Sequence, residues 1–351
     1  MRIGILGLGG VGRAFLSLLN DKNEELLNKG IQPKIVLALN SSSGCYKHGG
    51  IDIKKLLDYL DSSKDLSQLD EGFQGGDIHS LLDMADLDFL IEATPTDKIT
   101  GEPALSHMLS ALGRGINVVT ANKGPIMLDY KRLKDLGDTM GASIGIGCTA
   151  GGALPTVSSG QYDLLGAKVK EIRGVLNGTT NYILTLMEES EMDYPEALRK
   201  AQNEGIAETD PSMDVEGWDT AIKLIIIGNA LMGTNLKLRD AKVQGIQNLK
   251  LDDIKKAKSE DKKLKLMGKV YEDGGSWKIE VAPEEVEKDD IFFGVDGKNK
   301  GIQYHTDTLG EIAVLGGASN LKGAAASLLR DVLQIWSKNP GNLMKTFDFS
   351  E

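Results

Sequence analysis

One lysine stands in an otherwise apolar helical run, AIKLIIIGNAL, which extends from Ala221 to Leu231. A helix that is apolar on nearly all sides is predicted to be buried, so the ammonium of Lys223 needs a partner. Asp219 lies four residues before Lys223 and Glu216 seven residues before it, so helical periodicity places both carboxylates on the lysine's face. A partly desolvated lysine beside carboxylates is a group able to hold or deliver a proton at a reacting oxygen.

The competing interpretation is an exposed i,i+4 ion pair, which is the commoner arrangement for an Asp/Lys pair. Three further residues of the same stretch favour a functional site instead: Gly205, Glu208 and Asp214. We therefore predict a site built around Lys223 and Asp219.

The bulk composition limits the classes of partner. A chain of 351 residues suits two domains. The formal net charge of −11 and the pI near 5.0 argue against nucleic acid and against an anionic membrane, since phosphate groups would be repelled. The longest apolar stretch, inside 221–231, is too short to span a bilayer. Two cysteines are too few for a disulfide framework and fit a reducing cytoplasm. The four histidines lack metal-ligand spacing, so we expect ordinary surface or core residues: His48, His79, His107 and His305.

The N-terminus carries a glycine turn between a strand and a helix. The strand-like run 2–6 leads directly into GLGGVG at residues 7–12, and an amphipathic stretch follows from Arg13. In this context Gly7 permits a tight turn, Gly9 lets a pyrophosphate approach the backbone, and Gly12 lets the helix pack closely on the strand. We therefore predict that the turn, with Gly10 and Val11, binds a dinucleotide at a helix N-terminus. The alternative is a glycine-rich turn without a ligand.

Strand-like and helical runs alternate through the first half, which predicts a parallel, doubly wound sheet. The predicted strands are 34–39, 87–93, 116–120 and 143–146, and the predicted helices include 101–112 and 128–140. Ligands bind at the carboxyl ends of strands in such sheets. Thr94 and Pro95 follow one strand and Lys123 follows the next. We expect these residues at the cofactor, with Lys123 pointing into the cleft where nicotinamide and substrate meet.

The end of the second predicted strand bears on the choice of cofactor. NAD-specific sites usually place Asp or Glu there to hold the ribose 2′-hydroxyl. This chain has Asn40, followed by three serines and a glycine, with Lys47, Lys54 and Lys55 nearby. No carboxylate is present to repel a 2′-phosphate, so we expect NADP or NAD to bind, with a slight preference for NADP.

The pattern changes near residue 147, where strand-like runs at 168–176, 278–281 and 311–315 are combined with several helices. We predict an α/β protein: a Rossmann-type NAD(P)-binding domain over 1–146, an α+β substrate-binding, catalytic and dimerisation domain over 147–315, and a C-terminal segment, 316–351. The amphipathic helix predicted over 323–337 is expected to return to the nucleotide-binding domain.

Five motifs together resemble homoserine dehydrogenase. They are the glycine turn, TANKGP at 120–125, AGGALPT at 150–156, NGTTNYIL at 177–184 and GIAETDPSMDVEGWDTAIKL at 205–224. The resemblance covers most of the chain, and the last two motifs are specific. The family reduces L-aspartate 4-semialdehyde to L-homoserine with NAD(P)H, reversibly, on the route to threonine, methionine and isoleucine.

The resemblance implies roles for individual residues. Lys223 is the proton donor and acceptor at the substrate oxygen, Glu208 and Asp219 hold the substrate, and Lys123 stands beside it. Thr179 of NGTTNYIL and Asp214 join the substrate-binding group. The cofactor is expected to contact the glycine turn, Asn40, Thr94, Pro95, Lys123 and Gly205. The charges suit homoserine, whose ammonium needs acidic groups and whose carboxylate and reacting oxygen need cationic ones.

Three positions depart from the family pattern. Gly147 stands where the family has a glutamate that helps bind a monovalent cation, so Na⁺ or K⁺ would rest weakly on the backbone carbonyls of Ala150, Gly152 and Leu154 alone. A glycine-rich turn near the nicotinamide is altered, and only Gly316 and Gly317 carry over. The chain ends soon after the predicted C-terminal helix, so feedback through a C-terminal regulatory domain is not expected.

Two other functions stay open at this point. One is a different NAD(P)-dependent oxidoreductase of a small aldehyde or alcohol, which a substrate panel distinguishes. The other is a dinucleotide-sensing protein without turnover, which would not need Lys123 and Lys223. We expect a cytoplasmic homodimer by analogy with the family; the physiological direction is left open.

Overall fold

The computed structural model describes residues 1–338. The chain divides into two compact units. The first unit comprises Met1–Thr149 and the segment from Asn320 onward, and the second unit comprises Ala150–Ser319. The limits expected from the sequence, after 146 and after 315, stay a prediction. No helix among the described residues is long and apolar enough to cross a membrane.

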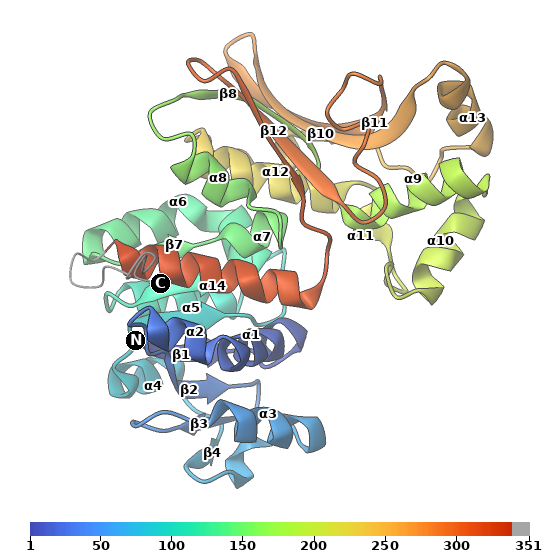
Figure 1. The fold of residues 1–351 in the computed structure, drawn as a ribbon. Coiled ribbons are helices and arrows are strands. Elements are labelled where there is room, and N and C mark those ends of the chain that lie inside the picture. Colours follow the sequence, from blue (N-terminus) through green and yellow to red (C-terminus); the bar gives the residue numbers. More distant parts are fainter. Residues whose placement is uncertain (339–351) are drawn as a thin grey trace, which may run out of the picture. The chain divides into compact units, whose positions relative to one another are not determined.

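The first unit is built on a seven-stranded sheet whose spatial order is β4-β3-β2-β1-β5-β6-β7 (Figure 1). Its strands are β1 (Arg2–Leu6), β2 (Lys34–Leu39), β3 (Ser43–Tyr46), β4 (Gly72–Gln74), β5 (Phe89–Glu92), β6 (Asn117–Thr120) and β7 (Ile144–Gly145). The pairs β1–β2, β1–β5, β5–β6 and β6–β7 are parallel. These strands are short, apolar and buried, as parallel strands covered on both faces must be. The predicted parallel sheet is confirmed.

The edge of this sheet differs from the expectation. Strands β3 and β4 were not predicted, and both pair antiparallel with their neighbours. The chain reverses after β2 because the side-chain oxygen of Asn40 accepts hydrogen bonds from the backbone nitrogens of Ser42 (3.0 Å) and Ser43 (2.9 Å). A side chain that bonds the backbone two or three residues on is a local turn device. It folds β3 back along β2.

The helices of the first unit pack around the sheet. They are α1 (Gly10–Asp21), α2 (Asn23–Asn28), α3 (Ile53–Ser62), α4 (Ile78–Ala85), α5 (Ala104–Leu112), α6 (Lys123–Met140) and α14 (Leu321–Ser337), with a short 3₁₀ turn, η1 (Leu66–Gln68); α7 (Gly147–Gly151) spans the boundary between the units. Two helices start earlier than predicted, α1 at Gly10 and α6 at Lys123. The N-cap of α6 is Asn122, whose side chain accepts from the backbone nitrogen of Gly124 (3.1 Å).

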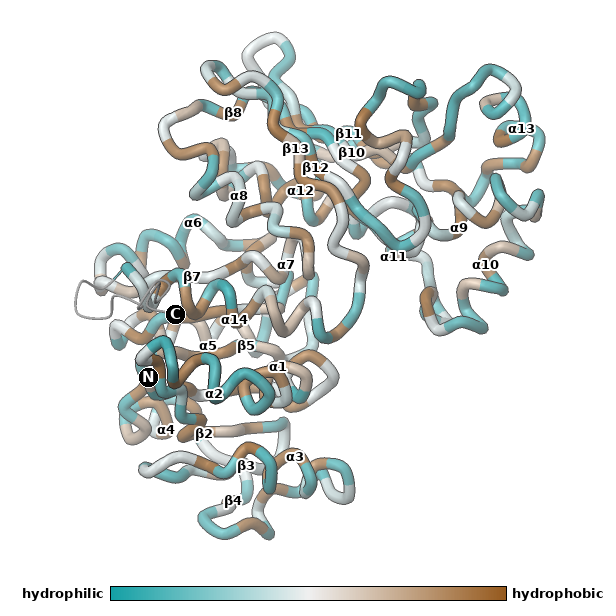
Figure 2. Tube along the Cα trace, in the orientation of Figure 1, coloured by the Kyte–Doolittle hydropathy of each residue, from teal (hydrophilic) through white to brown (hydrophobic). Residues whose placement is uncertain are grey.

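Helix α14 returns to the first unit, as predicted. Leu328 and Val332 are fully buried in one core with Ile3, Phe15 and Phe89. Figure 2 shows both hydrophobic and hydrophilic residues along α14, in keeping with an amphipathic helix that covers a core. The C-terminal helix is therefore part of the nucleotide-binding fold, although more than half of the chain separates it from β1.

The second unit contains a six-stranded sheet in the order β13-β12-β8-β10-β11-β9. Its strands are β8 (Val169–Val175), β9 (Ala241–Val243), β10 (Lys263–Asp273), β11 (Ser276–Val286), β12 (Lys300–Thr306) and β13 (Glu311–Gly316). The sequence predicted β8, part of β11 and β13, but missed β10 and β12. Strand β10 pairs with β11 over their full length and was overlooked because its lysines hide its apolar character.

The helices of the second unit include the predicted buried one. They are α8 (Thr156–Tyr162), α9 (Gly178–Ser190), α10 (Tyr194–Asn203), α11 (Ser212–Val215), α12 (Trp218–Leu231) and α13 (Leu251–Ser259), with a 3₁₀ turn, η2 (Leu238–Asp240). In α12 every residue from Thr220 to Gly228 is buried. The helix contacts β8, β10 and β11, so the apolar run covers the sheet and carries Lys223 inward.

A buried carboxyl explains why glycine stands at position 147. Asp331 of α14 is 5 % exposed and accepts a hydrogen bond from the backbone nitrogen of Gly147 at 2.7 Å. A Cβ at Gly147 would lie 2.8 Å from this carboxylate and 2.8 Å from the Arg330 guanidinium. The side chains of α14 thus occupy the space that a larger residue at 147 would need.

Burial raises the pKa of Asp331 to about 6, although Arg330 and the Gly147 N–H oppose this shift. The folded protein then binds the proton more tightly than the unfolded chain. The contribution of Asp331 to stability is therefore complete below about pH 4 and is lost as the pH rises through about 6.

We predict that Asp331→Asn removes this pH dependence. The variant should gain stability relative to the parent between pH 4 and pH 7, by up to roughly 3 kcal/mol, because the amide cannot ionise. Thermal or urea unfolding of both proteins across this range measures the difference. Asp135→Asn, which changes an exposed carboxyl on α6, is the control. A stability difference between Asp331→Asn and the parent that stays constant with pH would contradict the assignment.

Candidate active site

The glycine turn joins β1 to α1. Gly7 has a φ of +92°, and a Cβ there would lie 2.6 Å from the backbone nitrogen of Thr94. A Cβ at Gly12 would collide with the carbonyl oxygen of Gly7. At Gly9, by contrast, a Cβ would meet no atom of the described residues within 4 Å. Gly7 and Gly12 are therefore required by the protein's own packing, whereas the space beside Gly9 is open to a ligand.

The first turn of α1 is suited to an anion. Its leading residues are Gly10, Val11 and Gly12, whose backbone N–H groups have no acceptor within the helix. No acidic side chain stands in this turn. The positive end of the helix dipole and these donors favour a phosphate group.

Asn40 directly follows β2, and both its side-chain oxygen and its side-chain nitrogen form hydrogen bonds within the protein. Besides accepting from Ser42 and Ser43, it donates to the carbonyl oxygen of Lys64 at 2.5 Å. Two of the lysines expected nearby stand elsewhere: Lys47 pairs with Glu71 at 3.7 Å, and Lys54 lies in the first turn of α3. The last turn of α3, not the first, approaches the glycine turn, because Arg13 donates to the Leu60 carbonyl (2.6 Å).

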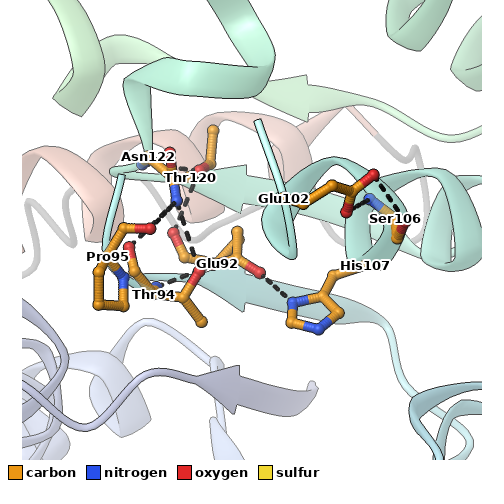
Figure 3. A network of polar contacts seen from close by, with 8 residues as sticks. All are labelled: Glu92, Thr94, Pro95, Glu102, Ser106, His107, Thr120 and Asn122. Carbon is orange, nitrogen blue, oxygen red and sulfur yellow. Dashed lines mark hydrogen bonds and ion pairs between the residues drawn. The ribbon is translucent and has the colours of Figure 1, made fainter. Parts of the chain in front are cut away.

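The carboxyl ends of β5 and β6 are joined by one amide. The side-chain nitrogen of Asn122 donates to the carbonyl oxygens of Thr94 and Pro95, each at 3.1 Å (Figure 3). Lys123, the first residue of α6, is half-buried directly after this amide. The structure thus gathers Thr94, Pro95 and Lys123, three predicted cofactor residues, at one edge of the sheet.

A buried carboxylate supports the same edge. Glu92 is 0 % exposed, and it accepts hydrogen bonds from the backbone nitrogen of Thr94 (2.8 Å) and from its hydroxyl. Its other oxygen meets Nδ1 of His107 at 2.8 Å. Figure 3 shows Glu92 between Thr94 and His107. Glu92 and His107 thereby fix the conformation of the Thr94 loop.

Lys223 is held inside the second unit by two contacts. Its ammonium lies 2.6 Å from Oδ2 of Asp219, one helical turn earlier, and donates to the carbonyl oxygen of Leu176 at 2.8 Å. Lys223 is 9 % exposed, so the predicted burial and ion pair are both present. The surface ion pair is excluded.

Asn177 links the acidic residues of this site. Its side-chain nitrogen donates to Asp214 (2.7 Å) and to Asp219 (2.9 Å), while its oxygen caps α9 by accepting from the backbone nitrogen of Thr180 (2.9 Å). Burial raises the pKa of Asp214, and the neighbouring Asp219 carboxylate raises it further; Asn177 and Lys223 oppose the shift. Two carboxyls, an amide and an ammonium therefore form one connected polar group.

Thr179 extends this group toward the segment that follows α10. Its hydroxyl interacts with Asp214 and donates to the carbonyl oxygen of Ile206 at 3.3 Å. Gly205, with a φ of +68°, precedes Ile206 and turns the exposed chain. Glu208 lies two residues beyond it, and its exposed carboxylate takes no hydrogen bond among the described residues. The structure thus gathers Lys223, Asp219, Asp214 and Thr179, with Gly205 adjacent and Glu208 on the open side.

The prediction for Glu216 was wrong. It assumed that the helix of Lys223 extends back through residue 216, but α12 begins at Trp218. Gly217, with a φ of +92°, separates it from α11. The exposed carboxylate of Glu216 instead accepts from the indole nitrogen of Trp218 at 3.2 Å.

The AGGALPT segment, called here the 150–156 loop, is packed against the end of β13. A Cβ at Gly317 would lie 2.5 Å from the backbone nitrogen of Leu154, so only glycine permits this approach. The ammonium of Lys300 donates to the carbonyl oxygen of Gly151 at 2.6 Å. The weak cation site expected on Ala150, Gly152 and Leu154 stays a prediction, and so does cofactor contact by Gly316 and Gly317.

Sequence reasoning missed four residues that shape these sites: Glu92, His107, Asn177 and Lys300. Only Asn177 left a readable local signal, because Asn before Gly at the start of an apolar helix is a strong N-cap pattern. Glu92 and His107 are joined across 15 residues of the chain, and Lys300 bonds a carbonyl oxygen 149 residues away, so neither contact leaves a local pattern.

The two sets of residues offer different chemistry. The first unit presents a glycine turn, a helix N-terminus and two strand ends that suit a dinucleotide. The second unit presents a buried lysine, able to exchange a proton, beside acidic groups able to hold an ammonium. Together they are the parts that a nicotinamide-dependent oxidation of an amino alcohol needs, since the cofactor supplies the hydride chemistry.

Comparison with protein families identifies both halves of the chain. Residues 7–145 match the model described as homoserine dehydrogenase, NAD binding domain, and residues 155–333 match the model described as homoserine dehydrogenase. The chain is 34 % identical to homoserine dehydrogenase of Methanocaldococcus jannaschii over 96 % of this chain and 99 % of that protein. It is 31 % identical to the NAD(+)-dependent homoserine dehydrogenase of Pseudomonas canavaninivorans, over 95 % and 96 %.

Solved structures agree with these relatives. A putative homoserine dehydrogenase from Archaeoglobus fulgidus superimposes with a TM-score of 0.86 at 30 % identity, covering 95 % of this chain and 99 % of that one. A hyperthermophilic archaeal homoserine dehydrogenase mutant in complex with NADPH gives a TM-score of 0.82 at 25 % identity, covering 97 % and 99 %. The α/β fold and the resemblance seen in the motifs are confirmed. With its glycine turn in one unit and its buried Lys223–Asp219 pair in the other, the chain belongs to the homoserine dehydrogenase family.

Proposed function

We propose that the chain catalyses the reversible reduction of L-aspartate 4-semialdehyde to L-homoserine with NADPH or NADH. The observation that carries this proposal is the buried Lys223 ammonium, held 2.6 Å from Asp219 in a family whose members are dehydrogenases. A protein that only senses a dinucleotide has no use for a desolvated lysine of this kind. An oxidoreductase of another small alcohol would not need a cluster of acidic groups around it.

The geometry of Lys223 supports a role in proton transfer. An ammonium has three hydrogens, and two of them are directed at Asp219 and at the Leu176 carbonyl. The third is left to meet a substrate oxygen. In homoserine oxidation the neutral amine takes the hydroxyl proton, and in the reverse reaction the ammonium returns it. When bound, the nicotinamide accepts or donates the hydride.

The acidic residues are proposed to bind the substrate's amino group. Asp214 and Asp219 are fixed by Asn177, so their orientation does not depend on the substrate. Glu208 stands on the exposed segment after Gly205 and is free to turn toward a bound ammonium. Thr179 ties this segment to α9, which supports its assignment to the substrate-binding group. Lys123, in the first unit, is proposed to contact the cofactor and to assist catalysis.

The proposed enzyme is a cytoplasmic homodimer that binds NADP or NAD. We infer a slight preference for NADP, supported by the amide in place of a carboxylate at Asn40. The glycine turn, Thr94, Pro95 and the glycine pair at 316–317 are assigned to the cofactor. Two buried free cysteines, Cys45 and Cys148, support a reducing cytoplasm. A homodimer is proposed by analogy with the family.

Oxidation of L-homoserine is the direct test of the activity. We expect an increase in nicotinamide absorbance with NADP and, somewhat more slowly, with NAD. The comparison substrates are L-serine, which is one carbon shorter, L-threonine, which carries its hydroxyl on Cβ instead of Cγ, and 1,3-propanediol, which lacks both charged groups. Faster turnover of any of these than of L-homoserine would favour the other oxidoreductase. A complete lack of turnover with intact cofactor binding would favour the sensor.

For the catalytic lysine we predict that Lys223→Ala lowers kcat by about 10²–10⁴-fold while cofactor affinity stays near normal. In the parent, kcat/KM for homoserine oxidation should rise with pH along an alkaline limb, because only the neutral amine accepts the proton. The limb should be absent from the variant. Asp219→Ala should raise KM and lower kcat, since it removes a positioning contact and leaves a buried ammonium without its carboxylate.

The matched control is Lys265→Ala. Lys265 is also a buried lysine, 1 % exposed, and is paired with Asp296 at 2.7 Å outside the site. Its loss should reduce stability but keep the alkaline limb. If Lys223→Ala retained the parent kcat and pH profile, Lys223 would be structural and Lys123 would become the candidate proton carrier.

For the glycine turn we predict that Gly9→Val and Gly12→Val fail in different ways. A side chain at Gly9 meets no protein atom, so the variant should fold with a normal Tm but bind NADP far more weakly. A side chain at Gly12 collides with the Gly7 carbonyl, so that variant should lose stability. Titration with NADPH, followed by its nicotinamide fluorescence, and thermal unfolding separate the two effects. Normal NADP affinity in Gly9→Val would remove the nucleotide from this turn.

A further inference from the structure

Strand β12 places two buried polar side chains on the 150–156 loop. Lys300, Ile302 and Tyr304 alternate along the strand and therefore share one face. The Lys300 ammonium donates to the carbonyl oxygen of Gly151 at 2.6 Å, and the Tyr304 hydroxyl donates to the carbonyl oxygen of Thr156. Lys300 is 2 % exposed and Tyr304 is 0 % exposed. One strand thus holds the loop near both of its ends.

The loop turns its backbone toward this ammonium. The Gly151 carbonyl oxygen also accepts from the backbone nitrogen of Leu154 (3.1 Å), and Gly152 adopts a φ of +57°. A Cβ at Gly152 would lie 3.6 Å from the Lys300 nitrogen. The Leu154 carbonyl oxygen is already an acceptor, for the backbone nitrogen of Thr156 at 2.8 Å. A buried positive charge therefore lies within the curve of the loop.

This arrangement does not fit a dissociable Na⁺ or K⁺ on the same loop. A carbonyl-bound alkali ion and an ammonium do the same work, since each offsets the partial negative charge of converging backbone oxygens. Two positive charges a few ångströms apart in a buried place repel each other strongly. The glycine at position 147, with Asp331 filling the adjacent space, removes the side chain that would have helped to hold an ion.

We propose that the Lys300 ammonium is the resident cation of the 150–156 loop and replaces a dissociable monovalent ion in this chain. Lys300 is then a positioning residue. It fixes Gly151, the loop fixes Leu154, and Leu154 packs on Gly317 at the end of β13. The consequence is an enzyme whose loop order, and hence activity, does not depend on the alkali cation in solution.

Thermal unfolding in different salts tests the proposal without relying on the proposed function. The parent should have the same Tm in NaCl, KCl and choline chloride at equal ionic strength. Lys300→Met should have a lower Tm in choline chloride, and small cations should restore it saturably, by roughly 5 °C or more, because binding to the folded state alone stabilises that state. Lys298→Met, which removes an exposed lysine two residues earlier, is the matched control and should behave as the parent.

Homoserine oxidation provides a second readout, and this arm alone rests on the proposed function. Activity of the parent should be equal in the three salts. Activity of Lys300→Met should be low in choline chloride and recover as Na⁺ or K⁺ is added. If the chain oxidised a different alcohol, the Tm measurements alone would still test whether Lys300 replaces the cation.

Two results would overturn the proposal. One is a parent protein whose Tm rises saturably with Na⁺ or K⁺ relative to choline, since a dissociable ion would then bind despite Lys300. The other is a folded Lys300→Met whose Tm and activity ignore the cation. If Lys300→Met folds only in Na⁺ or K⁺, the proposal is supported. If it folds in no salt, Lys300→Gln is used, and its indifference to cations would be equally decisive against the proposal.

Discussion

The structure of the second unit depends on how an ammonium is kept inside an apolar helix. Burying a charge without a partner costs far more free energy than any single packing contact returns. Lys223 avoids this cost because it pairs with Asp219, one turn earlier on α12, and donates a hydrogen bond to the carbonyl oxygen of Leu176. Asn177 in turn holds Asp219 and Asp214 and caps α9. The start of α9, the end of β8 and the entrance of α12 are therefore positioned by one polar group, and that group is also the candidate active site.

In the first unit, the glycine turn and the start of α1 expose backbone N–H groups that suit an anion. Gly7 and Gly12 are constrained by contacts within the protein, and Gly9 is constrained by none, so the turn separates its structural glycines from the glycine proposed to face the cofactor. The strand ends beyond it are made rigid by side chains. Asn122 joins the loops after β5 and β6, and the buried carboxylate of Glu92 accepts a hydrogen bond from the backbone nitrogen of Thr94. The residues proposed to contact the cofactor are thus supported by residues that are not.

The sequence predicted those features that depend on interactions between residues close together in the chain. The glycine turn, the apolar strands of the parallel sheet and the i,i+4 pair of α12 are each encoded within a few residues. Strand β10 was missed because Lys265 is buried against Asp296, a partner 31 residues away that no period reveals. Lys300 and Asp331 bond backbone atoms 149 and 184 residues away, and such contacts depend on the completed fold. Glu216 was misplaced because Gly217, which has a positive φ, ends the helical periodicity before α12 begins, and the sequence pattern alone does not show this break.

Chemical rescue is the sharpest test of whether Lys223 transfers the proton. Lys223→Ala leaves a cavity beside Asp219 that a small primary amine such as methylamine can enter. We expect added amine to restore homoserine oxidation in this variant saturably, with a dependence on pH that follows the neutral form of the amine added. Formamide, which is similar in size but is not a base, should have no effect. A Lys223→Ala enzyme that turns over at the parent rate and ignores added amine would show that Lys223 does not transfer the proton.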